Sequence, residues 1–127
     1  MEETSLLKLL EQRRNSFRYA ANGVRIALTT QAHAKIHLVA ALTVVYAGWR
    51  FAVSPAEWCA LLLAIALVWV SEAINTAVEL VVDLVSPGYS ELAGKAKDVA
   101  AGAVLLAAGL AAIVGAIVFA PKILAVL

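Results

Sequence analysis

The longest uncharged stretch of the chain sets the first constraint on its fold. Residues 99–120 contain no charged side chain, and two further largely apolar stretches cover residues 36–53 and 58–82. A helix needs roughly 20 apolar residues to cross the hydrocarbon core of a bilayer. The three stretches therefore predict three transmembrane helices in an all-α membrane protein.

The composition favours a membrane protein over a soluble domain. Of the 127 residues, 63% are hydrophobic and 15% are charged, and the mean hydropathy is +0.89. Soluble domains average about 25% charged residues, so this chain has little polar surface to offer to water. We expect a single domain over residues 1–127 and, because three helices enclose only a narrow core, an oligomer. The formal net charge of +1 argues against nucleic acid as a partner.

The first 35 residues predict a helix of another kind, which lies in the membrane interface. They carry charges throughout and lack the continuous apolar segment of a signal peptide. On a helical wheel of about 100° per residue, an apolar stripe runs along one side and Arg14, Arg18 and Arg25 gather roughly 90° away. The stripe consists of Leu6, Leu10, Phe17, Ala21, Val24 and Leu28. Such arginines suit either lipid headgroups or a polyphosphate, and the pattern leaves both open.

The lysines and arginines also predict the orientation in the membrane. Six precede the first span, namely Lys8, Arg13, Arg14, Arg18, Arg25 and Lys35. The first loop contains Arg50, the second loop contains Lys95 and Lys97, and Lys122 follows the third span. Cytoplasmic segments are rich in these residues. We therefore expect a cell inner (cytoplasmic) membrane protein with its N-terminus and its second loop, residues 86–98, in the cytoplasm.

Turn chemistry marks the ends of the second span. Ser54 and Pro55, with Glu57 close behind, predict a helix N-terminus. The run Ser86-Pro87-Gly88 predicts a break after that span. Residues 86–98 are accordingly expected to form a short loop.

Four polar residues interrupt the second span at spacings of three and four. Glu72, Asn75, Glu79 and Asp83 project from one side of a helix at this spacing. An acidic residue at the centre of a membrane helix costs roughly 2.5 to 3.5 kcal/mol, so a metal ion, a substrate or a proton must compensate the carboxylates. Aligned carboxylates serve both divalent-cation binding and general-base chemistry. Contact with water at the membrane surface, or specification of helix pairing, is the structural alternative.

The second loop adds two cations and a carboxylate at the mouth of the third span. These residues are Lys95, Lys97 and Asp98, and we expect them on the same side of the membrane as Asp83 and the N-terminal arginines. The lysines alone fit the positive-inside rule equally well. Together with the acidic side of the second span, they provide cations for phosphates and carboxylates for a metal, which are the groups that phosphoryl transfer requires. The sequence contains no glycine-rich phosphate loop of the Walker type.

These residues resemble a known family. The segment EAINTAVELVVD at residues 72–83, followed by Tyr89, Glu91-Leu92, AKD at 96–98 and AAGAVLL at 100–106, closely resembles the prokaryotic diacylglycerol kinase and undecaprenol kinase family. The resemblance covers nearly the whole chain. It implies a small homotrimeric membrane kinase that transfers the γ-phosphate of MgATP to a lipid hydroxyl, with active sites shared between subunits.

The resemblance also implies roles for the polar residues of the second span. Glu72 would be the general base for the lipid hydroxyl, and Glu79 would bind the Mg²⁺ that accompanies ATP. Asn75 and Asp83 would shape the same site. The family's second metal-binding glutamate is replaced here by Gln31, whose neutral carbonyl oxygen offers a hard cation less than a carboxylate does.

The nucleotide would be held by residues from several segments. The resemblance assigns this role to Lys97 and Asp98, with Tyr89 and Tyr19, next to the metal ligand Glu79. It does not assign any glycine-rich loop, in agreement with the absence of one in the sequence.

The sequence leaves alternatives open for the acceptor lipid and for the class of protein. The phrases KIHL at residues 35–38, DLVSP at 83–87 and DVAAG at 98–102 look more like the undecaprenol kinase branch than like the enterobacterial diacylglycerol kinases, so undecaprenol is favoured over diacylglycerol. His33 and His37 suit an interfacial or headgroup contact better than a metal site. A small oligomeric channel or proton-coupled transporter explains the buried acids but gives Lys97 and Asp98 no task, and a structural membrane subunit without activity is a weaker candidate.

Overall fold

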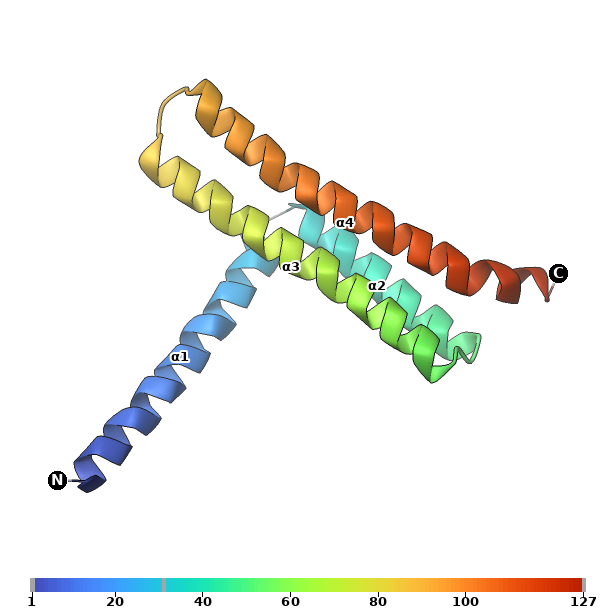
Figure 1. Ribbon diagram of the computed structural model, residues 1–127, viewed down its shortest axis with the longest axis horizontal. Helices are drawn as coiled ribbons and strands as arrows, with labels where there is room; N and C mark the ends of the chain where they lie inside the picture. The colour runs from blue at the N-terminus through green and yellow to red at the C-terminus, as the bar shows by residue number, and fades with distance from the viewer. Residues whose placement is uncertain (1, 31, 127) are drawn as a thin grey trace.

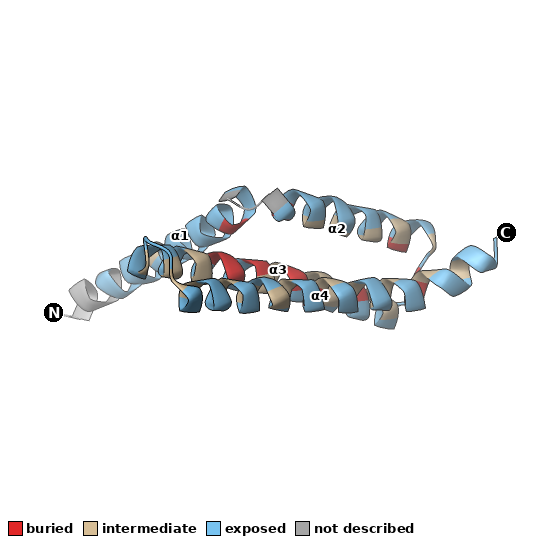
Figure 2. Cartoon of the chain, turned by 90° about the horizontal axis from the view of Figure 1, so that it is seen from above, coloured by how far each residue is buried: buried red, intermediate tan, exposed pale blue. Residues whose placement is uncertain are grey.

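The structure is a computed structural model that describes residues 2–30 and 32–126, with side chains from 8–29 and 33–126. Within these residues the chain is helical: α1 (Glu2–Thr30), α2 (Ala32–Arg50), α3 (Pro55–Val85) and α4 (Glu91–Leu124). Figure 1 shows α3 and α4 running side by side while α1 projects away from them, and Figure 2 shows α2 on one side of this pair. The predicted all-α architecture is confirmed.

Two of the described helices are long and apolar enough to cross a membrane. They are α3, with 31 residues, and α4, with 34 residues, and they contain the predicted spans 58–82 and 99–120. At about 1.5 Å per residue, each helix is longer than the roughly 30 Å of a hydrocarbon core, so its ends extend beyond that core. The predicted span 36–53 falls largely on α2, which does not meet the same criterion because His33, Lys35, His37 and Arg50 lower its hydropathy. The third span stays a prediction.

The helix ends of α3 follow the turn chemistry of the sequence. Ser54 Oγ accepts a hydrogen bond from the Glu57 N–H at 3.3 Å, and Glu57 Oε2 accepts one from the Ser54 N–H at 2.6 Å. This reciprocal capping box, with Pro55 in the first turn, satisfies amide groups that a helix leaves unpaired. The helix ends at Val85, directly before Ser86. Both predicted boundaries are confirmed.

The second loop is shorter than the sequence indicated. Ser90 caps α4, since its hydroxyl accepts a hydrogen bond from the Ala93 N–H at 3.4 Å, and the helix begins at Glu91. The expectation of a loop over residues 86–98 is therefore wrong at its C-terminal side. The physical reason is that an N-cap serine starts a helix whose first turns are polar. Lys97 and Asp98 consequently lie on a helix.

The connection from α2 to α3 is tight and depends on two small residues. Ala52 adopts a left-handed conformation with φ of 49°, and the Val53 N–H donates to the Gly48 carbonyl oxygen at 3.1 Å. These are the marks of a Schellman ending. Gly48 is buried against Trp58, and a Cβ at this position would lie 2.6 Å from Trp58 Cη2. A larger residue at position 48 would therefore push α2 away from α3.

The packing is densest between α3 and α4. At the Pro55 end of α3, the buried residues Val53, Leu61 and Val118 form an apolar cluster, onto which Val44, Trp58, Val114 and Phe119 pack. Lys122 Nζ lies 3.0 Å from Glu57 Oε1 at the same end and joins the two helices. In Figure 2, buried residues concentrate along α3, whereas the outward surfaces are exposed.

Candidate active site

The buried polar side chains of the described part of the chain gather on one helix. Glu72, Asn75 and Thr76 on α3 are 2%, 6% and 3% exposed. A buried carboxylate is costly unless hydrogen bonds or opposite charges compensate it. The four polar residues predicted to share one face of this helix differ in burial. Glu72 and Asn75 are buried, whereas Glu79 is partly buried and Asp83 is exposed.

Glu72 is compensated from a second helix. Its Oε1 lies 3.0 Å from Nε2 of His37 on α2, and the two side chains are 3% and 17% exposed. On α3 itself, the hydroxyl of Thr76 donates to the Glu72 backbone carbonyl at 2.9 Å. The His37 ring also meets the ring of Trp69 edge-on, with centroids 6.5 Å apart and planes at 74°. The carboxylate with the deepest burial therefore has an imidazole partner that is itself held by an aromatic ring.

Asn75 contacts Glu79, one turn further along α3. Its Nδ2 donates to Glu79 Oε1 at 3.1 Å, which orients the Glu79 carboxylate. Its Oδ1 is buried and accepts no hydrogen bond from any described residue. An unsatisfied buried acceptor costs about 1–3 kcal/mol, so a donor from a ligand would stabilise this position.

A cavity of about 240 Å³ opens at these residues. It is lined from α2 and α3 by His33, His37, Glu72 and Asn75, and from α4 by Ala101, Val104, Leu105 and Ala108. The polar walls come from two helices and the apolar wall from the third. The cavity thus offers a carboxylate and an amide oxygen to a ligand that carries a hydrogen-bond donor on an apolar body.

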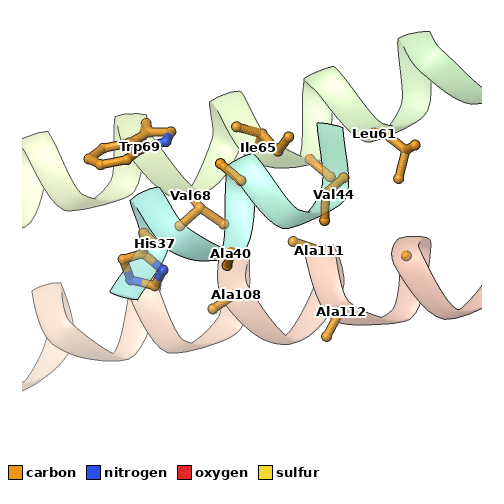
Figure 3. A pocket seen from close by; sticks show the side chains of 13 residues that line it. His37, Ala40, Val44, Leu61, Ile65, Val68, Trp69, Ala108, Ala111 and Ala112 are labelled. Carbon is orange, nitrogen blue, oxygen red and sulfur yellow. The ribbon is translucent and has the colours of Figure 1, made fainter. Parts of the chain in front are cut away.

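A second, apolar cavity of about 340 Å³ adjoins the first. The two share His37 and Ala108 among their lining residues. Figure 3 shows Val44 of α2, Leu61 and Val68 of α3 and the alanines of α4 around this space, with His37 and Trp69 at one end. The small side chains of α4 leave room between the helices. The polar side chains of the first cavity therefore lie next to an apolar cavity.

The polar residues beyond Glu79 lie near the turn between α3 and α4. Lys97 Nζ pairs with Asp83 Oδ1 at 2.6 Å, across 14 residues of sequence, and Lys95 pairs with Glu91 at 2.6 Å within one helix face. Asp98 is exposed. Lys97 was predicted to lie near the acidic side of α3, and its pair with Asp83 confirms this proximity.

The two tyrosines expected near a nucleotide are exposed in the single chain. Tyr89 is 99% exposed in the α3–α4 turn. Tyr19 on α1 is 67% exposed, and Arg18 Cζ lies 5.6 Å from its ring centroid. Neither tyrosine, nor Asp98, lines the cavity at Glu72.

The predicted metal ligands can be placed only in part. Gln31 lies outside the described residues. In the described ranges, no group of three or more His, Cys, Asp or Glu side chains comes close enough to hold a metal ion by itself. Glu79 remains the carboxylate that Asn75 orients, which suits a cation bound mainly through the phosphates of a ligand.

His37 is the residue whose contact the sequence did not reveal. The sequence indicated an interfacial or headgroup contact for it, whereas the structure pairs it with Glu72. A histidine within an apolar stretch is the signal that was available, because such a side chain requires a hydrogen-bond partner when it is buried. Its partner lies on another helix, and helical periodicity says nothing about partners between helices.

Comparison with known proteins places these residues in a family. Residues 18–119 match the family described as prokaryotic diacylglycerol kinase. A diacylglycerol kinase of Synechocystis sp. is 44% identical over 113 residues, which are 88% of this chain and 65% of that protein. An undecaprenol kinase of Bacillus subtilis is 36% identical, covering 85% of this chain and 88% of that protein.

A third relative is also a diacylglycerol kinase. The diacylglycerol kinase of Escherichia coli is 35% identical over 89 residues, 70% of this chain and 73% of that protein. The matched region contains α2, most of α4 and the whole of α3 with its polar face. The chain, a helical membrane protein with the buried carboxylate Glu72 on α3, belongs to the prokaryotic diacylglycerol kinase family.

Proposed function

We propose that the chain transfers the γ-phosphate of MgATP to the hydroxyl of a membrane lipid, with undecaprenol as the favoured acceptor. One observation carries this proposal. The buried carboxylate of Glu72 lines the 240 Å³ cavity, which shares the lining residues His37 and Ala108 with the apolar cavity. A lipid alcohol has the matching form, because a hydroxyl donor sits at the end of a hydrocarbon chain.

Glu72 serves as the general base in this reaction. The lipid hydroxyl donates to the Glu72 carboxylate, and the Oδ1 atom of Asn75 is available as a further acceptor. As the lipid oxygen forms its bond to the γ-phosphorus, the bond from that phosphorus to the bridging oxygen breaks. ADP leaves with the bonding electron pair, and Glu72 takes the hydroxyl proton. Removal of such a base typically costs about 10² to 10⁴ in rate.

Glu79 fits a magnesium ion that arrives with ATP. Mg²⁺ prefers oxygen ligands and is usually held by one or two carboxylates together with substrate phosphates. The Asn75 hydrogen bond keeps one Glu79 oxygen in place, and Gln31 would contribute a carbonyl oxygen. When bound, the ion neutralises charge on the β- and γ-phosphates.

The nucleotide is proposed to lie at the α3–α4 turn. Lys97 offers its ammonium group to the phosphates in place of Asp83, while Asp98, Tyr89 and Tyr19 contact the remainder of the nucleotide. Their exposure in the single chain supports a site completed by a neighbouring subunit, and we propose a homotrimer with shared sites. Because ATP is cytoplasmic, the N-terminus and the α3–α4 turn face the cytoplasm of the inner membrane.

Diacylglycerol is the second candidate acceptor. The Synechocystis relative named diacylglycerol kinase favours it, whereas the Bacillus relative named undecaprenol kinase, together with KIHL at residues 35–38, favours undecaprenol. The two lipids differ in shape, because undecaprenol is a primary alcohol on one polyprenyl chain and diacylglycerol carries two acyl chains.

A phosphorylation assay tests the function and the acceptor together. Purified protein in detergent micelles is incubated with γ-labelled ATP, MgCl₂ and either undecaprenol or diacylglycerol, and the labelled lipids are separated. We expect label in undecaprenol at a higher kcat/KM than in diacylglycerol, and a rate lowered by about 10² to 10⁴ with the Glu72→Gln protein. A higher kcat/KM for diacylglycerol would show that undecaprenol is the wrong acceptor, while the proposed phosphoryl transfer would stand. No label in any lipid would overturn the proposal and favour a channel or transporter.

A further inference from the structure

We propose that His37 is the positioning residue of the Glu72 carboxylate, so that the base is built from two helices. This inference rests on the proposed function, in which Glu72 takes the proton of the lipid hydroxyl. The contact that carries it is the 3.0 Å distance from His37 Nε2 to Glu72 Oε1. An ionised carboxylate only accepts hydrogen bonds, so in this contact the proton resides on Nε2.

The imidazole is fixed in its plane as well as at its donor atom. Trp69 lies three residues before Glu72 on α3, which places both on neighbouring positions of one helix face. The Trp69 ring meets the His37 ring edge-on at 74°. With one edge against Trp69 and one nitrogen on Glu72, the ring has little freedom to rotate away.

The surroundings leave His37 as the donor to Glu72. The Glu72 side chain is only 3% exposed, so water has little access to it. Of the other groups that line this cavity, α4 supplies apolar side chains, Asn75 directs its amide to Glu79, and the remaining titratable group is His33, one turn before His37 on α2. Loss of the His37 donor would therefore leave the carboxylate without its interhelical hydrogen bond.

Positioning matters because a glutamate has three side-chain torsions. A hydrogen bond that holds Oε1 leaves Oε2 as the oxygen that receives the lipid hydroxyl. Base catalysis requires the acceptor within about 2.6 to 3.2 Å of the proton donor in the reactive complex. A misplacement of about 1 Å can cost on the order of 10²-fold in rate. The expected signature is a loss in kcat that spares the binding of ATP.

Three substitutions at one position separate the hydrogen bond from packing. His37→Leu fills space without a donor. His37→Gln places an amide nitrogen close to the position of Nε2, whereas His37→Asn carries the same amide on a side chain one methylene shorter. We expect kcat to fall roughly 10- to 100-fold for the leucine and asparagine variants, and to recover to within about threefold of the parent for the glutamine variant. The KM for ATP should stay the same in all three.

A double-mutant cycle shows whether His37 acts through Glu72. In a Glu72→Gln background, His37→Leu should not lower the residual kcat further, because residues that act as a unit are not additive. The thermal midpoint of each detergent-solubilised protein is measured alongside. If the leucine variant fails to fold, the glutamine and asparagine variants carry the comparison.

The outcomes are distinguishable from failure of the proposed function. A parent protein without kinase activity overturns that function, and the His37–Glu72 contact is then judged from the imidazole ¹⁵N signals, which should shift in Glu72→Gln. With an active parent, a leucine variant of unchanged kcat refutes the positioning role. Equal losses for leucine and glutamine variants, or an undiminished effect in the Glu72→Gln background, refute it as well.

Discussion

The two halves of α3 illustrate opposite uses of burial. Near Pro55, the buried side chains are apolar, and Leu61 is 2% exposed within the cluster that Val53 and Val118 complete. From Glu72 onward, the buried side chains are polar, and their hydrogen bonds run to α2 and along α3. The apolar half gains van der Waals contacts between helices, whereas burial of the polar half costs free energy that its partners offset.

This difference teaches where to look for stability and where to look for chemistry. The cavity linings place α2 and α4 beside both halves, and α1 also contacts α3. On the proposed function, the polar groups are buried in this half because the reaction uses them. We therefore expect substitutions near Pro55 to change the free energy of unfolding, and substitutions from Glu72 to Lys97 to change turnover or ligand affinity.

The largest expected effect is that of Glu72→Gln. The amide keeps the size of the side chain and a carbonyl oxygen that accepts from His37, but it cannot take a proton. Turnover should fall by about 10² to 10⁴ with the thermal midpoint nearly unchanged. Measured kcat within tenfold of the parent would remove Glu72 from the role of base and blur the division of α3.

The next effect is that of Val118→Ala in the apolar cluster. Loss of two buried methyl groups should lower the free energy of unfolding by about 1 to 3 kcal/mol, from lost burial and a residual cavity. Ile117→Ala is the matched control, because Ile117 is 69% exposed and Val118 is 6% exposed. Denaturant titrations in detergent compare the two. Equal losses for both would show that the apolar half of α3 is not the stabilising one.

A smaller effect is expected for Lys97→Ala. Lys97 lies on α4 and pairs with Asp83 at the C-terminal end of the polar half of α3. Removal of one charged hydrogen bond to a phosphate should raise the KM for ATP about tenfold, since such bonds are worth about 1.5 to 3 kcal/mol. Lys95→Ala is the control, because Lys95 forms an exposed pair with Glu91 on the same helix. Steady-state kinetics with varied ATP distinguish them. A KM that moves equally in both variants would indicate a general charge effect.

The smallest effect is expected for Gln31→Glu, which introduces the carboxylate that the family resemblance implies at this position. An added anionic oxygen should lower the Mg²⁺ concentration for half-maximal activity by up to about tenfold, because two unit charges about 4 Å apart interact by roughly 4 kcal/mol at an effective dielectric near 20. The shift should disappear in a Glu79→Ala background. A midpoint that stays in place, or that moves equally in both backgrounds, would separate residue 31 from the metal.

Much of the fold was predictable because its signals are local. Ser54, Pro55 and Glu57 supply a capping box within four residues, and spacings of three and four align Glu72 with Asn75 and Glu79. Such signals act within one helix and need no knowledge of its neighbours. The second loop was misjudged for the related reason that a polar first turn resembles a loop when the Ser90 cap is overlooked.

Only the tertiary structure determines which side chains on different helices contact one another. Periodicity fixes which face of α2 carries His37, but the rotation and the longitudinal offset of α2 against α3 depend on the packing at Gly48 and Trp58. The His37–Glu72 contact follows from that offset, and the Lys97–Asp83 pair follows from the packing of α4 against α3. The sequence determined that carboxylates share a helix face, because helical geometry is local. Their partners were decided by the tertiary fold, because side-chain packing between helices sets distances that no single helix contains.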